Sequence, residues 1–173
     1  IKDDLINLAK KTKIKSKIKQ MISGVKINRS ENRSVDHFNL RKKEYLETKE
    51  WKNLINFTKK ILNKKSFKSI VNVGVGGSHL GPSMVNQALK SFYKGPKIFY
   101  VSDIDPINLI EVFGECNPKT TLFIITSKSF GTLETLENAK MIKNWLADSN
   151  ISLNDGMIAV TSSEEKAKKW GFE

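Results

Sequence analysis

The feature that most constrains this chain is a change of pattern at residue 69, where short apolar runs begin to alternate with helical stretches. The apolar runs predict strands over residues 69–75, 97–102, 120–126 and 156–161. Helical periodicity predicts helices over residues 80–93, 106–115, 131–147 and 163–170. Strands that alternate with helices form parallel sheets with right-handed crossovers. We therefore predict an α/β fold, a doubly wound parallel sheet of at least four strands.

The residues before this change have a different character and predict an N-terminal helical segment. Mixed three-and-four spacing of apolar residues predicts a helix over 3–22, which Gly24 ends. Two further helices are expected over 33–40 and 42–64. The chain thus divides into a helical segment over 1–68 and a ligand-binding domain over 69–173.

The net charge of +12 is concentrated in the helical segment. Residues 1–68 hold 20 of the 30 Lys and Arg but only 7 of the 18 Asp and Glu. Solvated helix faces explain this excess best, because the lysines at 10–19 lack interleaved aromatic side chains. We expect no nucleic-acid or membrane partner; a nucleic-acid-binding region stays as a weaker alternative, testable by its salt sensitivity.

Cysteine use and targeting signals bear on the compartment. Cys116 is the single cysteine, which fits a reducing environment and excludes an internal disulfide framework. No signal-peptide pattern is visible, and no apolar run approaches the roughly 18 residues of a membrane span. We predict a cytoplasmic location.

No His or Cys pair has metal-ligand spacing, so we expect no metal.

A glycine-rich turn follows the first predicted strand. Gly74, Gly76 and Gly77 leave backbone N–H groups uncovered, and a helix begins beside them. Such a turn suits an anion, most often a phosphate. It is not a Walker A loop, since no Gly-Lys-Ser/Thr follows, and the third glycine of a dinucleotide fingerprint is replaced by His79. The alternative is an ordinary tight strand-to-helix turn.

A second loop of similar character follows the third predicted strand. Ser127, Ser129 and Thr132 supply hydroxyl groups near a helix start, and Lys128 supplies a charge. Alone, this loop would be interpreted as a serine-capped helix with a solvated lysine. Together with the glycine-rich turn it favours a phosphorylated small molecule.

Four ordered segments resemble the glucose-6-phosphate isomerase family, whose halves are sugar-isomerase (SIS) domains. They are Lys26-Ile-Asn-Arg-Ser-Glu-Asn-Arg-Ser-Val-Asp-His-Phe-Asn-Leu-Arg41, Val73-Gly-Val-Gly-Gly-Ser-His-Leu-Gly-Pro82, Tyr100-Val-Ser-Asp-Ile-Asp105, and Pro118-Lys-Thr-Thr-Leu-Phe-Ile-Ile-Thr-Ser-Lys-Ser-Phe-Gly-Thr-Leu-Glu-Thr135. The resemblance runs from about residue 24 to the end. It implies an SIS-type, flavodoxin-like sandwich over 69–173, the first SIS domain, incomplete at its C-terminal end.

The resemblance also implies a substrate and its contacts. The family interconverts glucose 6-phosphate and fructose 6-phosphate through an enediolate, in glycolysis and gluconeogenesis, without metal or cofactor. The positions that match its sugar-phosphate contacts are Gly77, Ser78, Ser127, Lys128, Ser129, Phe130, Gly131 and Thr132.

No catalytic residue is expected within this chain. The family's catalytic Glu, its ring-opening His and Lys, and the Arg that stabilises the enediolate all come later. His37, His79 and Glu134 do not match those positions. We therefore expect a piece of a longer isomerase, homodimeric when whole, that binds but does not turn over. The alternative is a stand-alone or degenerate sugar-phosphate-binding SIS module without turnover.

Overall fold

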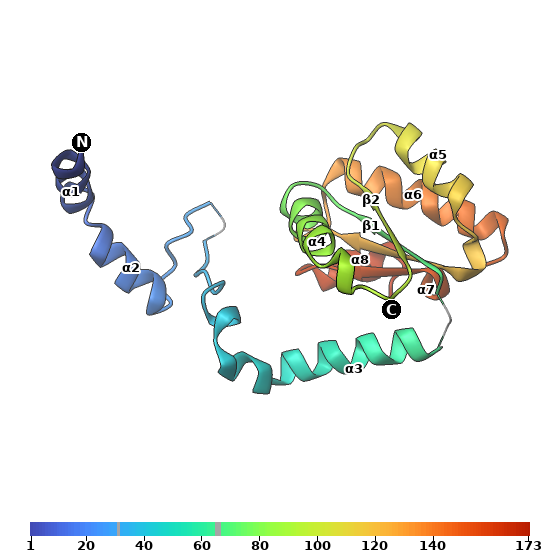
Figure 1. Cartoon of the computed structure of the whole chain (residues 1–173), viewed down its shortest axis with the longest axis horizontal. Helices are drawn as coiled ribbons and strands as arrows, with labels where there is room; N and C mark the ends of the chain where they lie inside the picture. Colours follow the sequence, from blue (N-terminus) through green and yellow to red (C-terminus); the bar gives the residue numbers. More distant parts are fainter. Residues whose placement is uncertain (31, 65–66) are drawn as a thin grey trace. The chain divides into compact units, whose positions relative to one another are not determined.

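The computed structural model describes residues 1–30, 32–64 and 67–173. The chain separates into two compact units, Ile1–Lys60 and Ile61–Glu173 (Figure 1). These units are defined by their internal contacts. The assignment of 1–68 and 69–173 to different roles therefore stays a proposal.

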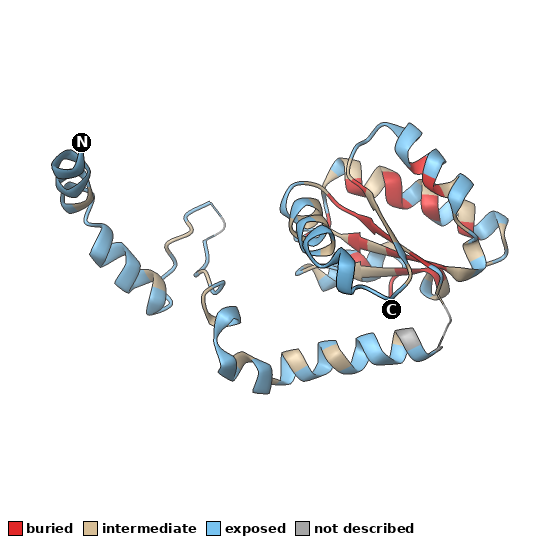
Figure 2. Cartoon of the chain, in the orientation of Figure 1, coloured by how far each residue is buried: buried red, intermediate tan, exposed pale blue. Residues whose placement is uncertain are grey.

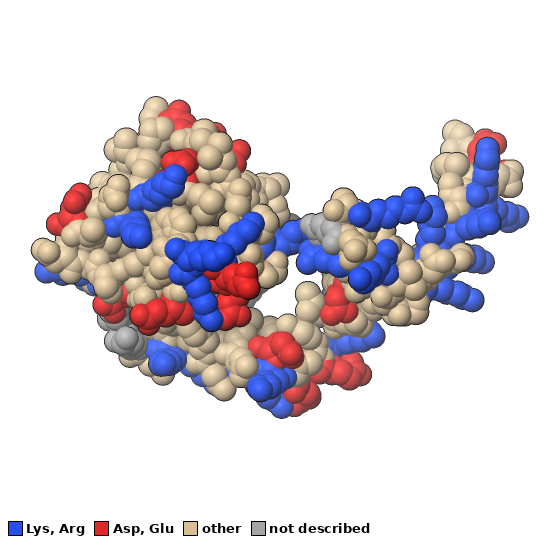
Figure 3. Space-filling view, turned by 180° about the vertical axis from the view of Figure 1, so that it is seen from behind, with Lys and Arg blue, Asp and Glu red and all other residues tan. Residues whose placement is uncertain are grey.

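The first unit consists of short helices with no buried residue in its described part (Figure 2). Its elements are α1 (Lys2–Lys11), α2 (Ile14–Ile22), the 3-10 turns η1 (Asn39–Arg41) and η2 (Lys43–Glu47), and most of α3 (Lys49–Lys64). Lys and Arg side chains project along this unit (Figure 3). Its apolar side chains remain partly solvated: Leu5 is 61% exposed.

The predicted boundaries in the first unit are partly wrong. The single helix expected over 3–22 is broken because Lys13 adopts a left-handed conformation, with φ +53°. The helix expected over 33–40 does not form, since the backbones of Asn28 and Arg33 pair as an isolated antiparallel bridge. The helix expected over 42–64 starts later, where the Thr48 hydroxyl accepts a hydrogen bond from the Trp51 N–H at 3.3 Å.

The second unit contains the predicted parallel sheet. Its strands are β1 (Ser69–Val73), β2 (Lys97–Val101), β3 (Thr121–Thr126) and β4 (Met157–Val160). They pair in the order β2-β1-β3-β4, and every pairing is parallel. The doubly wound α/β fold predicted from the alternating pattern is confirmed.

The helices of the second unit lie close to their predicted positions. They are α4 (Gly77–Ala88), α5 (Pro106–Glu115), α6 (Leu133–Asp148) and α8 (Glu164–Trp170), with 3-10 turns η3 (Lys90–Phe92) and η4 (Pro118–Thr120). The one-turn helix α7 (Leu153–Gly156) was not predicted, because four residues are too few to show a period. Asp105 caps α5 as its pattern predicts, accepting a hydrogen bond from the Ile107 N–H at 2.9 Å.

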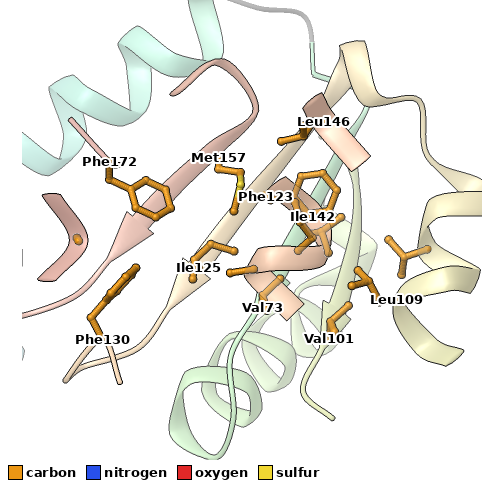
Figure 4. Packing of buried hydrophobic residues seen from close by; sticks show 14 residues of the cluster. Val73, Val101, Leu109, Phe123, Ile125, Phe130, Ile142, Leu146, Met157 and Phe172 are labelled. Atoms are coloured by element: carbon orange, nitrogen blue, oxygen red, sulfur yellow. The ribbon is translucent and has the colours of Figure 1, made fainter. Parts of the chain in front are cut away.

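The core lies on one face of this sheet. Odd-numbered strand residues such as Val73, Phe123 and Ile125 are fully buried and pack against α5 and α6 (Figure 4). Alternation explains this, because successive strand side chains point to opposite faces. The even-numbered face carries Asn72 and Tyr100, which hydrogen-bond to α4. The helices thus cover both faces, as the doubly wound pattern requires.

Candidate functional site: two loops at the edge of the sheet

The strand order creates one switch point in this sheet. The connection from β1 leads outward to β2, and the next connection returns past β1 to β3. Ligands of open α/β sheets bind beyond the carboxyl ends of the strands at such a reversal. The predicted glycine turn (residues 74–77) follows β1, and the second predicted loop, here called the serine loop (residues 127–132), follows β3, so both lie at this point.

The glycine turn is shaped by two of its glycines. A Cβ atom on Gly74 would lie 2.8 Å from the Thr126 carbonyl oxygen, so only glycine allows β1 and β3 to approach there. Gly76 has φ +55° and ψ −125°, a conformation that L side chains rarely adopt. The chain therefore turns directly into α4, three residues earlier than the predicted start at residue 80.

The first turn of α4 leaves room for a ligand. Apart from its chain neighbours and the nearby backbone of α4 itself, no described heavy atom lies within 4 Å of the position that a Cβ atom on Gly77 would take. Gly77 is exposed and Ser78 half-buried, and both belong to the first helical turn. Backbone N–H groups and the helix dipole give such a helix start a partial positive charge, which suits an anion.

The serine loop presents two hydroxyls at the start of α6. Ser127 is 2% exposed, and its Oγ lies 3.1 Å from Thr132 Oγ1. Thr132 occupies the N-cap position of the 16-residue α6 without a side-chain capping bond. Lys128, Ser129 and Gly131 between them are exposed. The arrangement can offer hydroxyl and backbone donors to a dianion.

Phe130 holds the serine loop to the body of the second unit. Its φ of +45° is unusual for a non-glycine residue, and its ring is 3% exposed. The ring packs edge-on against Trp170 and Phe172, at centroid distances of 6.3 and 5.8 Å. The Phe130 side chain is thus an anchor in the core, although the resemblance places it among the substrate contacts.

The segment after β4 supports the loop through its backbone. The Lys128 carbonyl accepts hydrogen bonds from Ser162 Oγ at 2.7 Å and Thr161 Oγ1 at 3.1 Å. The Lys166 Nζ donates to the Ser129 carbonyl at 3.2 Å. These hydrogen bonds hold the backbone of Lys128 and Ser129 in place, while both residues remain exposed.

Sequence reasoning missed a buried amide beneath the two loops. Asn72 is 7% exposed, its Nδ2 donates to the Ser78 carbonyl at 2.9 Å, and its Oδ1 accepts from Thr126 Oγ1 at 3.1 Å. The sequence signal that could have revealed this amide is a polar residue between the valines at 71 and 73, within the run that predicts a buried strand. A buried amide needs partners of its own.

A second buried amide fixes the third loop at this edge. Asn138 of α6 is 2% exposed, and its Nδ2 donates to the Asp103 carbonyl at 2.6 Å. The loop between β2 and α5 is thereby fastened to the helix that carries Thr132. The feature that marks Asn138 is a polar residue on the buried side of α6, next to the buried Ala139.

Two aromatic rings lie between α4 and the sheet. The Tyr100 hydroxyl donates to the Pro82 carbonyl at 3.1 Å, and burial raises the pKa of Tyr100. The His79 ring packs edge-on against Tyr100 at 5.5 Å, and its buried Nδ1 has no partner among the described residues. His79 therefore lies beneath the helix as a packing group.

Two further features bear on the kind of site. The described residues include no group of three or more His, Cys, Asp or Glu side chains that could hold a metal ion. No helix in the described part of the chain is long and apolar enough to cross a bilayer.

Comparisons with known proteins identify the family of this chain. The family model for phosphoglucose isomerase matches residues 1–173. The chain belongs to the phosphoglucose isomerase family. The resemblance inferred from the four segments is thereby confirmed.

Individual relatives of this isomerase family match nearly the whole chain. A glucose-6-phosphate isomerase of Buchnera aphidicola is 38% identical over 190 residues, covering 97% of this chain and 35% of the relative. One from Francisella tularensis is 35% identical over 192 residues, covering 98% and 36%. The crystal structure of a glucose-6-phosphate isomerase from Chlamydia trachomatis superposes with a TM-score of 0.77 at 27% identity, covering 91% of this chain and 34% of that chain. The chain spans about a third of the length of these isomerases.

Proposed function

We propose that this chain supplies the phosphate and sugar contacts of an aldose–ketose isomerase that interconverts glucose 6-phosphate and fructose 6-phosphate. The observation that carries the proposal is the hydroxyl pair of Ser127 and Thr132 at the start of α6, next to the glycine turn. Membership of the phosphoglucose isomerase family supports the choice of a sugar phosphate.

In this proposal the two loops hold different parts of the ligand. The phosphate lies on the serine loop, where hydroxyl and backbone donors and the start of α6 balance its charge. Lys128 adds a full positive charge at the exposed part of this loop. The sugar lies over Gly77 and Ser78, where the open space above the glycine admits it.

The chemical step is proposed to use groups from outside this chain. The ring opens, a carboxylate moves a proton between C1 and C2, and an enediolate forms. A general base needs an orienting partner and a position within reach of the proton it removes. The base and the groups of ring opening are expected in the part of the longer relatives that this chain does not span. The whole isomerase is proposed to be a cytoplasmic homodimer.

A calorimetric titration of this chain with fructose 6-phosphate tests the binding role. Fructose and inorganic phosphate serve as controls for the two halves of the ligand. We expect fructose 6-phosphate to bind more tightly than either control, because only it engages both loops. Equal binding of inorganic phosphate and fructose 6-phosphate would contradict the proposed sugar contacts. An absence of all binding by the folded chain would reject these loops as a sufficient site.

The second candidate is an SIS module that binds sugar phosphate without turnover. It needs only the two loops, because none of the proposed ligand contacts depends on a residue outside this chain. A turnover assay on the reading frame extended beyond residue 173 separates the two candidates. Conversion of fructose 6-phosphate supports the isomerase, whereas a stop codon at that point supports the module.

A further inference from the structure

A proline inside α4 leaves one backbone carbonyl without its helical donor. Pro82 is the sixth residue of α4, well inside the helix. In an α-helix the N–H of a residue donates to the carbonyl four positions earlier, which here is that of Ser78. Proline has no N–H, so the Ser78 carbonyl needs a donor from outside the helix.

Asn72 supplies that donor from the neighbouring strand. Its Nδ2 reaches the Ser78 carbonyl at 2.9 Å, while its Oδ1 accepts the Thr126 hydroxyl at 3.1 Å. Both polar ends of this buried amide are therefore used. One side chain of β1 joins the first turn of α4 to the last residue of β3.

The two ends of this bridge adjoin the two proposed ligand loops. Ser78 directly follows Gly77, and Thr126 directly precedes Ser127. A second contact at the same place is the close approach of Gly74 to the Thr126 carbonyl. The amide and the glycine thus add two contacts between the glycine turn and the end of β3, beyond the backbone pairing of β1 with β3.

We propose that Asn72 is a positioning residue that fixes the glycine turn against the serine loop, so that one ligand can contact both. The consequence for binding rests on the proposed sugar-phosphate function. The consequence for the loops does not, because the bridge exists without ligand. Binding sites need first contacts held to within about 0.5 Å, which a hydrogen-bonded support behind them provides.

The sharpest variant is Thr126→Val, which keeps a β-branched side chain but removes the donor to Asn72. Thr121→Val is the matched control: Thr121 begins the same strand, is 1% exposed, and donates to the Asn117 carbonyl at 2.8 Å. It lies at the opposite end of the sheet from both loops. The two variants thus each remove one part-buried hydrogen bond of a threonine hydroxyl, and only that of Thr126 is proposed to support the site.

Two measurements compare these variants with the parent chain. Titration with fructose 6-phosphate should show about tenfold weaker binding for Thr126→Val, a change of ~1.4 kcal/mol, and little change for Thr121→Val. Amide hydrogen exchange without ligand should be faster at residues 77–80 in Thr126→Val alone. Equal exchange at 77–80 in both variants would overturn the inference. If the parent chain binds no sugar phosphate, the proposed function fails while the exchange result still decides the role of Asn72.

The double variant Asn72→Ala, Pro82→Ala distinguishes two roles of Asn72. One is to position the glycine turn against the serine loop, and the other is only to donate a hydrogen bond to the Ser78 carbonyl. Alanine at 82 restores an N–H to that carbonyl, so Pro82→Ala should recover stability lost in Asn72→Ala. It should not recover affinity, because the link to Thr126 is still missing. A double variant that regains full affinity would show that Asn72 only satisfies a carbonyl. Failure to regain stability would show that the Ser78 carbonyl is not the group that matters.

Discussion

The two units of this chain differ in what holds them in shape. The second unit buries a continuous apolar cluster, whereas no described residue between 1 and 60 is buried. Both units contain amphipathic helices, but among the described residues a sheet forms only in the second unit, where α4, α5 and α6 pack against it. The two proposed ligand loops lie in the unit with the core, and buried side chains support each of them.

The difference shows why an apolar stripe alone does not predict a core. Ile14 and Ile18 recur at helical spacing in α2, yet each is 47% exposed. Leu109 and Val112 recur similarly in α5 and are 0% and 5% exposed. Most helical stability comes from packing such a face, so the first unit is held mainly by local interactions.

The largest expected effect is on the free energy of unfolding, when a central side chain of the core is truncated. Phe123 is fully buried and contacts the rings of Phe113 and Trp145. Phe123→Ala should lower the free energy of unfolding by about 3–5 kcal/mol. The truncation Leu5→Ala in the first unit should change it by less than about 0.5 kcal/mol, because Leu5 is 61% exposed. Denaturant unfolding of both variants measures the contrast; similar losses would mean that the units are not distinct in stability.

Loss of binding without loss of fold is expected from Gly77→Val. Apart from the chain neighbours and the nearby backbone of α4, no described atom lies within 4 Å of the new Cβ, so the valine occupies the space proposed for the sugar phosphate. Binding of fructose 6-phosphate should be abolished in a titration. Gly81→Val is the control, because Gly81 lies one turn later in the same helix with equally open space. Retained affinity in Gly77→Val would place the ligand elsewhere.

A smaller effect on binding is expected from the hydroxyl pair. Ser127→Ala or Thr132→Ala should each weaken binding of fructose 6-phosphate by roughly 1–3 kcal/mol, since each removes a hydrogen bond to a charged group. Thr135→Val is the control, because the buried Thr135 hydroxyl has no partner among the described residues. Unchanged affinity in both alanine variants would reject the serine loop as the phosphate site.

The smallest effect is expected from deleting residues 1–20. These residues carry much of the positive charge but none of the proposed ligand contacts. Affinity for fructose 6-phosphate should stay within about 0.5 kcal/mol of the parent chain, as for changes away from a site. Salt-sensitive binding to a nucleic acid that this deletion removes would instead support the alternative for the basic region.

The sheet could be predicted because its strands are short, apolar and buried. β3 was predicted over 120–126 and is observed over Thr121–Thr126. The start of α4 was placed too late, because the positive φ of Gly76 allows the helix to follow the turn at once. The prediction is poorest for the first unit, because its helix ends depend on local backbone conformations such as the left-handed one at Lys13. No pattern of buried residues marks these positions in the sequence.

The two loops could be located from the sequence, but their support could not. Glycine and hydroxyl residues after apolar runs predict a ligand site, and the structure places the two loops that carry them after the neighbouring strands β1 and β3. The bridge through Asn72 depends on which strands are neighbours, and Thr126 is distant in sequence. The burial of Phe130 likewise depends on Trp170 and Phe172, which no local pattern connects to the loop.

The anchoring of Phe130 has a consequence for the order in which the site is made. During synthesis the chain emerges from its N-terminal end, at roughly 5–20 residues per second. The glycine turn and the hydroxyls of the serine loop leave the ribosome well before Trp170 and Phe172. The left-handed backbone at Phe130 gains its compensating contacts only when those rings arrive. A nascent chain stalled before residue 170 should therefore carry every proposed ligand residue, while its serine loop has not yet reached the folded conformation.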